Sequence, residues 1–229
     1  LYLLLTQNKY KIIKMKIINK LDTYVIANKL SAVNIEKSFK NSFNLMLKAG
    51  KLAAKTIDSL YSKRKTLILC GVGGNGGDGF IIAQELFNKG WDIKVSIVGD
   101  QNKIKGDSLK ALNKLKLKPF SFNEINIDKT KLFIDAIYGI GLSRNINKKE
   151  CTILNTLDKH PAPIIAIDIP SGIDCNNGKV LGFACYSDLT ITFSTLKAGH
   201  ILLPGSEKIN RIKVLDIGIS KDFINKIKP

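Results

Sequence analysis

The sequence is poor in the residues on which metal centres, redox chemistry and membrane insertion usually depend. It has two histidines and four cysteines, and no two cysteines have the C-x-x-C spacing of zinc or redox sites. Its apolar start is only five residues long, and no window approaches the roughly 20 apolar residues of a membrane-spanning helix. We therefore expect a cytoplasmic protein with reduced thiols and no membrane partner.

Acidic residues are also scarce. Nineteen Asp and Glu stand against 36 Lys and Arg, which gives a formal net charge of +17. Such a field can attract nucleic acids or small anions. The lysines are spread along the whole chain, however, and the longest basic cluster is only Lys63, Arg64 and Lys65, without interleaved aromatic residues. This distribution favours a solvated lysine-rich surface and makes a nucleic-acid partner a poor prediction.

The chain does contain a regular alternation of apolar and amphipathic segments. Strand-like apolar runs occupy residues 66–70, 93–98, 131–137, 163–169, 188–193 and 211–217. Helical patterns occupy residues 35–60, 79–90, 106–116 and 148–160. This alternation predicts a three-layer αβα Rossmann-like fold with a mostly parallel sheet, whose last strands follow one another without full helices. We expect one domain over residues 31–229 and an N-terminal extension, disordered or partly artefactual, over residues 1–30.

The segment CGVGGNGGDGF, residues 70–80, follows the first predicted strand and contains G-x-G-x-x-G at Gly71, Gly73 and Gly76. That spacing is typical of loops that place a pyrophosphate on a helix N-terminus. Asp78 is expected in the first turn of the next helix, where it would act as an acidic N-cap and compete with phosphate for N–H donors. The glycines alone are therefore weak support for hydride chemistry. A P-loop is excluded because no G-K-[ST] follows.

Polar residues also follow three later strands. Asp135 precedes YGIGLSRN, Asp168 precedes the PSG turn that contains Ser171, and STLKAGH follows the strand 188–193. Ligands of open parallel sheets bind at the carboxyl ends of the strands. We therefore expect Asp135, Asp168 and Ser171 to meet the glycine-rich loop in one crevice, although each residue alone is also explained as a turn or strand-end residue.

Four segments together resemble the YjeF N-terminal domain family, the NAD(P)H-hydrate epimerases. GVGGNGGDGF is similar to the family's G-x-G-N-N-G-G-D-G loop, and FIDAIYGIGLSRNI to its V-D-A-x-F-G-T-G-L-x-R segment. The stretch 164–205 resembles the family's P-S-G segment and its T-F-x-x-x-K-x-G strand, and the closing IKVLDIGI also fits. The resemblance covers about residues 35–220 in order.

The resemblance implies an isomerase that interconverts the R and S forms of hydrated NADH and NADPH (NADHX and NADPHX) in cofactor repair. It implies a homodimer, a NAD(P)H-hydrate dehydratase as functional partner, and K⁺ as cofactor. It implies potassium ligands at Asn75, Asp135 and Ser171. It implies a substrate site at Gly74, Asn75, Gly76, Gly77, Asp78, Gly139, Ile140, Gly141, Leu142, Ser143, Arg144, Asn145 and Asp168.

Inversion at C6 of the hydrated nicotinamide ring would remove a hydroxyl and return water to the opposite face. The leaving hydroxide needs a proton, and the returning water needs a base. Asp168 is our candidate for this proton shuttle. Lys197 is a candidate for holding the phosphate or assisting the proton transfer, and equally for a plain surface lysine. Gly74 and Ile140 replace the family's usual Asn and Thr, so we expect weakened substrate contacts but not lost catalysis.

Two other functions stay open at this point. A non-catalytic relative would be a scaffold or an RNA- or nucleotide-binding protein, and salt-sensitive RNA binding would identify it. A NAD-dependent oxidoreductase would need a substrate domain, for which 229 residues leave little room.

Overall fold

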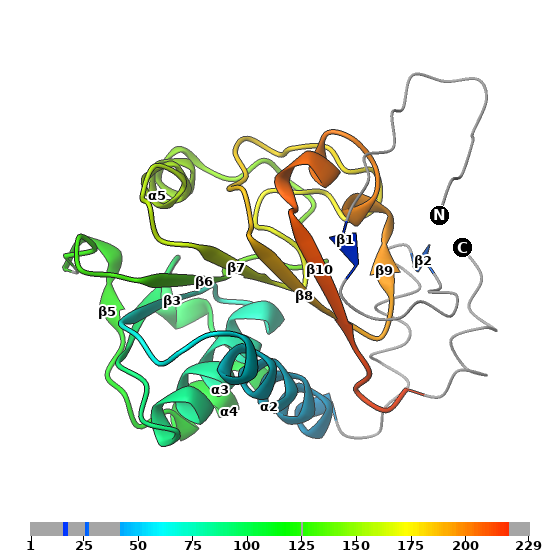
Figure 1. Ribbon diagram of the computed structural model, residues 1–229. Helices are drawn as coiled ribbons and strands as arrows, with labels where there is room; N and C mark the ends of the chain where they lie inside the picture. The colour runs from blue at the N-terminus through cyan, green and yellow to red at the C-terminus, as the bar shows by residue number, and fades with distance from the viewer. Residues whose placement is uncertain (1–15, 18–25, 28–41, 125, 220–229) are drawn as a thin grey trace, which may run out of the picture.

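The computed structural model describes residues 16–17, 26–27, 42–124 and 126–219. Their centre is an eight-stranded sheet in the order β1-β10-β8-β7-β6-β3-β4-β5, in which every neighbouring pair is parallel (Figure 1). The strands are β1 (Lys16–Ile17), β3 (Thr66–Cys70), β4 (Ile93–Ile97), β5 (Phe120–Ser121), β6 (Leu132–Ala136), β7 (Ile164–Ile167), β8 (Leu189–Phe193) and β10 (Arg211–Leu215). A separate parallel pair joins β2 (Ile26–Ala27) to β9 (Leu196–Lys197).

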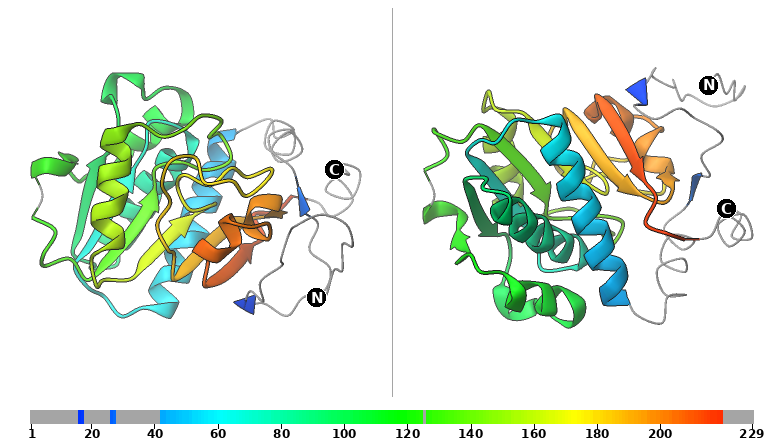
Figure 2. Two further views of the ribbon diagram at one scale, coloured as in Figure 1. Left: turned by 90° about the horizontal axis from the view of Figure 1, so that it is seen from above. Right: turned by 60° about the horizontal axis from the view of Figure 1, so that its bottom comes forward.

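Helices cover both faces of this sheet. The helices are α2 (Ser42–Leu60), α3 (Gly74–Asn88), α4 (Gly106–Lys114) and α5 (Lys148–Asp158). Figures 1 and 2 show α2, α3 and α4 on one face and α5 on the other. This arrangement confirms the predicted three-layer fold and its parallel sheet. None of the described helices combines the length and the apolarity needed to cross a bilayer.

The order of the last elements also agrees with the prediction. Between β8 and β10 the chain forms only β9 and two short 3₁₀ turns, η3 (Ala198–His200) and η4 (Gly205–Lys208). Two further 3₁₀ turns, η1 (Gln101–Lys103) and η2 (Phe122–Glu124), precede α4 and follow β5. The two-residue strands β1, β2, β5 and β9 have no signal of their own in the sequence. Of these, β1 and β2 lie within residues 1–30, and the rest of that segment is outside the described residues.

Two apolar clusters hold the layers together, one on each face of the sheet. All five residues of β3 are buried, as expected for a central parallel strand. Ile68 packs toward α3 with Phe80 and Leu86, whereas Leu67 and Leu69 pack toward α5. Because successive strand side chains point to opposite faces, one continuous apolar run supplies both clusters.

The start of α3 was predicted wrongly. The helix begins at Gly74, not at residue 79, and its N-cap is Gly73. Asp78 is therefore the fifth helical residue and not an acidic cap in the first turn. The apolar periodicity begins only at Phe80, because glycines occupy most of the first turns. The glycine-rich segment is thus mostly helix, and only its first residues form a loop.

Close packing explains two of the glycines in this segment. A Cβ at Gly71 would overlap the Ile137 carbonyl oxygen, and a Cβ at Gly76 would overlap the Gly71 carbonyl oxygen. By contrast, a Cβ at Gly73 or Gly74 would meet nothing within 4 Å. The buried glycines bring α3 against the ends of β3 and β6, while the first residues of the helix stay open to solvent.

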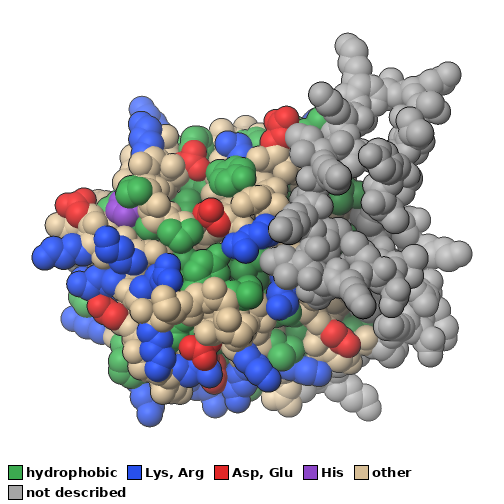
Figure 3. All heavy atoms as spheres, viewed as in Figure 1, with side chains coloured by type: hydrophobic (Ala, Val, Ile, Leu, Met, Phe, Trp, Pro, Cys, Tyr) green, Lys and Arg blue, Asp and Glu red, His purple; other side chains and the backbone are tan. Residues whose placement is uncertain are grey.

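On one face of the molecule, the basic side chains are mixed with others rather than concentrated. On the face in Figure 3, Lys and Arg side chains lie among acidic and apolar side chains. This distribution agrees with the solvated lysine-rich surface expected from the sequence.

The closely packed Gly76 and the open Gly74 should respond differently to substitution by alanine. Gly76→Ala should lower the free energy of unfolding by roughly 2 kcal/mol or more, because backbone atoms must move to admit the methyl group. Gly74→Ala should change it by less than about 0.5 kcal/mol, because the added methyl group contacts nothing. Urea unfolding followed by circular dichroism would measure both. Equal losses in the two variants would contradict this account of the segment.

Candidate functional site

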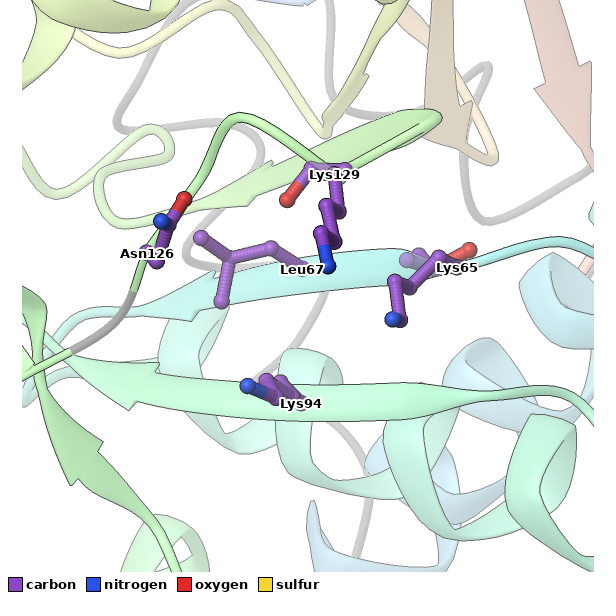
Figure 4. Close-up of a pocket in the computed structure, with 7 residues that line it drawn as sticks. Lys65, Leu67, Lys94, Asn126 and Lys129 are labelled. Carbon is purple, nitrogen blue, oxygen red and sulfur yellow. The ribbon is translucent and has the colours of Figure 1, made fainter.

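A cavity of about 580 Å³ lies at the carboxyl ends of the strands. It is enclosed by the start of α3, the loop after β6, the end of β7 and parts of α2 and α4. A smaller hollow of about 170 Å³ lies at the opposite end, where Figure 4 shows Lys65, Lys94 and Lys129 around it. The smaller hollow contains no predicted site residue, so the cavity at the carboxyl ends is the candidate site.

The cavity contains most of the predicted substrate residues. Those that line it are Gly74, Asn75, Asp78, Gly139, Ile140, Gly141, Leu142 and Asp168. Gly76 and Gly77 are buried inside α3, and Ser143, Arg144 and Asn145 are exposed beyond the cavity. Asp135, Ser171 and Lys197 are buried behind its wall. The predicted loops therefore lie at the cavity, but only some of their predicted residues line it.

Asp168 occupies a tight turn directly after β7. Its backbone has φ +66°, and the Ile169 N–H donates to the Ile167 carbonyl oxygen at 2.9 Å across the turn. A left-handed, non-glycine residue inside such a γ-turn is uncommon and strained. The Asp168 carboxylate accepts a hydrogen bond from the Ile140 N–H at 3.0 Å. A Cβ at Gly139 would lie 2.7 Å from Asp168 Oδ2, so a larger residue at 139 would displace the carboxylate.

Lys197 forms a buried ion pair with Asp168. Its Nζ donates to Asp168 Oδ1 at 2.7 Å, to Thr192 Oγ1 at 2.7 Å and to the Phe193 carbonyl oxygen at 3.3 Å. An ammonium group has three protons, so these bonds use all of them. Thr192 Oγ1 in turn donates to Asp168 Oδ1 at 3.2 Å. Lys197 therefore faces the back of Asp168 and does not reach into the cavity as a phosphate ligand would.

The charges of this network follow from its surroundings. Burial raises the pKa of Asp168, but the Lys197 charge and hydrogen bond outweigh it and leave the pKa below its usual value. Burial and the nearby Lys197 charge lower the pKa of His200 to about 4. At neutral pH the site thus holds an ionised Asp168 and a neutral His200.

Asp135 and Ser171 form a second buried group beside the cavity. Ser171 Oγ donates to Asp135 Oδ1 at 2.6 Å, and the Ser171 N–H donates to Oδ2 at 2.9 Å. Ser171 Oγ also accepts from the Tyr138 N–H at 2.9 Å. Burial raises the pKa of Asp135, and the hydrogen bonds from Ser171 only partly oppose it. A carboxylate without a cationic partner on the described residues therefore lies beneath the cavity wall.

Asn75 is the most unusual polar residue of the site. Both polar atoms of its side chain are buried, and neither has a hydrogen-bond partner among the described residues. A Cβ at Gly139 would lie 3.3 Å from Asn75 Cγ, so Asn75 and Asp168 approach the same glycine. Buried polar groups without partners are rare and costly. An amide oxygen, a carboxylate and a hydroxyl are oxygen ligands suited to a hard cation.

The exposed Arg144 belongs to a neighbouring network. Its Nη2 donates to the Tyr138 hydroxyl at 3.2 Å, and that hydroxyl donates to Glu150 Oε1 at 2.7 Å. Glu150 also completes the capping box of α5 with Asn147. Burial, reinforced by Glu150, raises the pKa of Tyr138 to about 12. This network anchors the loop after β6 to α5.

Sequence reasoning missed three of these residues as parts of the site. No role was predicted for Thr192, Tyr138 or Glu150. The His200 ring in fact contacts both members of the ion pair through their backbones. The only indication of this contact in the sequence is that His200, one of two histidines, lies three residues after Lys197.

The buried neutral His200 predicts a pH-dependent stability. Its pKa is about 4 in the folded protein and 6.5 without burial, so only the unfolded chain binds a proton between these values. Stability from this group is therefore lost as the pH falls from 6.5 to 4, by roughly 3 kcal/mol in total. Urea unfolding across this range should show the loss in the wild type and much less of it in His200→Gln. Parallel pH curves for the two proteins would contradict the assignment.

Named proteins resemble this chain over most of its length. The NAD(P)H-hydrate epimerase of Oenococcus oeni is 32% identical over 69% of this chain and 77% of its own length. That of Elusimicrobium minutum is 32% identical over 80% of this chain and 88% of its own length. The bifunctional NAD(P)H-hydrate repair enzyme Nnr of Moorella thermoacetica is 29% identical, and the chain covers only 37% of that enzyme.

A solved structure and a family match agree with these relatives. The crystal structure of yeast ynu0, YNL200c, has a TM-score of 0.70 over 88% of this chain and 93% of that chain. At 22% identity, this likeness shows the fold alone. Residues 42–199, more than half of the chain, match the family described as YjeF-related protein N-terminus. The resemblance found in the sequence is thereby confirmed, and the chain belongs to the family of YjeF-related protein N-termini.

Proposed function

We propose that this protein is an isomerase that interconverts the R and S forms of hydrated NADH and NADPH. The observation that carries the proposal is an ionised, almost fully buried carboxylate, Asp168, which reaches the cavity surface with Lys197 bonded behind it. Two relatives named NAD(P)H-hydrate epimerase support the reaction. Two neighbouring segments, the start of α3 and the loop after β6, lie within residues 42–199, which match the family.

The pair Asp168–Lys197 would move the proton that the reaction needs. Asp168 passes a proton to the C6 hydroxyl as it accepts one from Lys197 Nζ, and the C6–O bond breaks to release water. The nicotinamide ring becomes a cation, which the Asp168 carboxylate stabilises by its charge. Water then adds to the opposite face of C6, and its proton returns through Asp168 to Lys197. Atoms and charges balance, and Lys197 assists proton transfer rather than binding phosphate.

The substrate diphosphate would lie against the start of α3. The cavity lining includes Asp78, Asp107 and Asp168 but no Lys or Arg of the described residues. Phosphate binding must then depend on backbone N–H groups, which a helix N-terminus offers together with its dipole. Gly73 and Gly74 leave that end open, since no atom lies within 4 Å of a Cβ at either position.

We propose that Asn75, Asp135 and Ser171 hold the potassium ion that the family resemblance implies. The residues fit such an ion, because the buried Asn75 amide has no hydrogen-bond partner among the described residues and Asp135 is a buried carboxylate with a raised pKa. The group contains a single carboxylate, in agreement with the finding that no three His, Cys, Asp or Glu side chains cluster as metal ligands in the described part of the chain. A bound potassium ion would supply positive charge and oxygen coordination at the wall of the cavity.

The proposal extends to the surroundings of the enzyme. The bifunctional relative, of which this chain covers little more than a third, supports a second repair activity as functional partner. We take that partner to be a NAD(P)H-hydrate dehydratase. A homodimer, a cytoplasmic location, and a single domain over residues 31–229, to which the upstream strands β1 and β2 pair, complete the proposal.

Epimer exchange tests the reaction directly. Purified protein is mixed with separated R-NADHX in potassium buffer, and the S form is followed by chromatography against the uncatalysed background. Asp168→Asn should reduce the rate by about 10²–10⁴-fold, because it removes the group that transfers the proton. Asp174→Asn, a matched change in the same loop at a residue that does not line the cavity, should retain the rate. A wild-type rate equal to the buffer, or a fully active Asp168→Asn, would refute the proposal.

Thermal unfolding tests the cation site without any substrate. In buffer with choline as the only cation, Asn75→Ala should not destabilise the protein, because it removes an unpartnered buried amide that costs about 1–3 kcal/mol. In potassium buffer the wild type should be more stable than Asn75→Ala, because only the wild type gains stability from the bound ion. Asn176→Ala, at an exposed position, is the control. The same difference between wild type and Asn75→Ala in both buffers would count against a site at Asn75.

A further inference from the structure

His200 has no part in the proposed mechanism, but its ring is hydrogen-bonded to the backbones of both Asp168 and Lys197. We propose that His200 is a positioning residue, which holds the Asp168 turn and the Lys197 segment in the arrangement needed for proton transfer. This inference rests on the proposed function, since it assigns a role in that same reaction. His200 is completely buried and does not line the cavity, so any effect on the reaction must pass through its partners.

The two hydrogen bonds of the ring define its protonation. The Lys197 N–H donates to His200 Nδ1 at 3.0 Å, so Nδ1 carries no proton. The proton of the neutral ring is then on Nε2, which lies 2.8 Å from the Asp168 carbonyl oxygen and donates to it. One ring thus connects the backbone of Asp168 to the backbone of Lys197. The side chains of the same two residues form the ion pair, in which Lys197 Nζ lies 2.7 Å from Asp168 Oδ1.

The backbone at this point needs an external constraint. Asp168 at φ +66° and Ser194 at φ +59° are the two described non-glycine residues with left-handed backbones. Each lies at the centre of a γ-turn, closed by Ile169 N–H to Ile167 at 2.9 Å and by Thr195 N–H to Phe193 at 2.6 Å. These strained turns end the adjacent strands β7 and β8. Strained turns persist only where surrounding contacts hold them, and His200 supplies such a contact to the Asp168 turn.

His200 is itself held firmly. It ends the 3₁₀ turn η3, and the preceding Gly199 donates its N–H to the Cys175 carbonyl oxygen at 2.8 Å. A Cβ at Gly199 would lie 3.0 Å from Cys175 Cα and 3.0 Å from Ile169 Cδ1, so η3 packs closely on the loop after β7. The loop that begins with Asp168 therefore packs against η3, and η3 carries the His200 ring that hydrogen-bonds to Asp168. Such a closed set of contacts can keep a carboxylate aligned without touching substrate.

Two substitutions separate the two hydrogen bonds. In His200→Gln the terminal amide takes the place of Nε2 and can still donate to the Asp168 carbonyl oxygen. In His200→Asn the amide oxygen takes the place of Nδ1 and can still accept from Lys197, but the bond to Asp168 is lost. His160→Gln, at the other histidine of the chain, is the matched control.

The expected result is a loss of kcat without a matching change in KM. His200→Asn should lower kcat for epimer exchange by about tenfold or more, since small misplacement of a reacting group has effects of that size or larger. His200→Gln should recover most of kcat, and KM should change by less than about twofold in both variants. His160→Gln should behave as the wild type. Wild-type kcat in a folded, destabilised His200→Asn would mean that His200 is only structural, and would overturn the proposal.

A second measurement separates this inference from the proposed reaction. The titration of the Asp168 carboxyl carbon can be followed by NMR in the wild type and in both variants, with no substrate present. If His200 aligns the ion pair, the pKa of Asp168 should rise in His200→Asn and return toward the wild-type value in His200→Gln. An unchanged pKa in His200→Asn would overturn the positioning role. If the wild type has no epimerase activity, this titration alone decides whether His200 positions the pair.

Discussion

The buried pair of Asp168 and Lys197 is the constraint around which the rest of the site is arranged. A buried carboxylate stays ionised only when a cation and hydrogen-bond donors replace the water that it loses. Lys197, Thr192 and the Ile140 N–H provide those contacts. Ile140 lies in the segment after β6, Thr192 in β8 and Lys197 in β9, whereas Asp168 itself follows β7. The pair can therefore form only when the parallel sheet has brought the ends of these strands together.

The glycine-rich segment has a different role from the one its spacing suggests. In a dinucleotide fingerprint the glycines form a loop that wraps a pyrophosphate. Here most of them are inside α3, where Gly76 permits contact with the backbone at Gly71. Asn75 thereby lies close to Gly139, with a side-chain amide that has no hydrogen-bond partner in the described part of the chain. The segment thus combines a packing function on one side of the helix with an open helix end and a polar side chain on the other.

Much of this architecture could be predicted from the sequence, for identifiable reasons. Strands such as β3 and β6 are apolar runs buried on both faces, and such runs are typical of central strands in a parallel sheet. The rule that ligand sites form at strand ends predicted Asp168 at the cavity, whereas Asp135 and Ser171, which bond to each other, are buried behind its wall. The start of α3 could not be predicted, because glycines have no periodicity. One His200 contact is with the left-handed turn at Asp168, which no local pattern of polar and apolar residues encodes.

The short strand β2 changes how the boundaries of this protein should be drawn. Ala27 pairs with Lys197 in the small second sheet, and β1 covers the edge of the main sheet at β10. The family match begins only at residue 42. A fragment cut at that residue would leave backbone groups beside Lys197 unpaired and would expose β10 as an open edge, which invites association with other chains. The smallest unit that keeps both strand pairings therefore starts upstream of the residues that match the family.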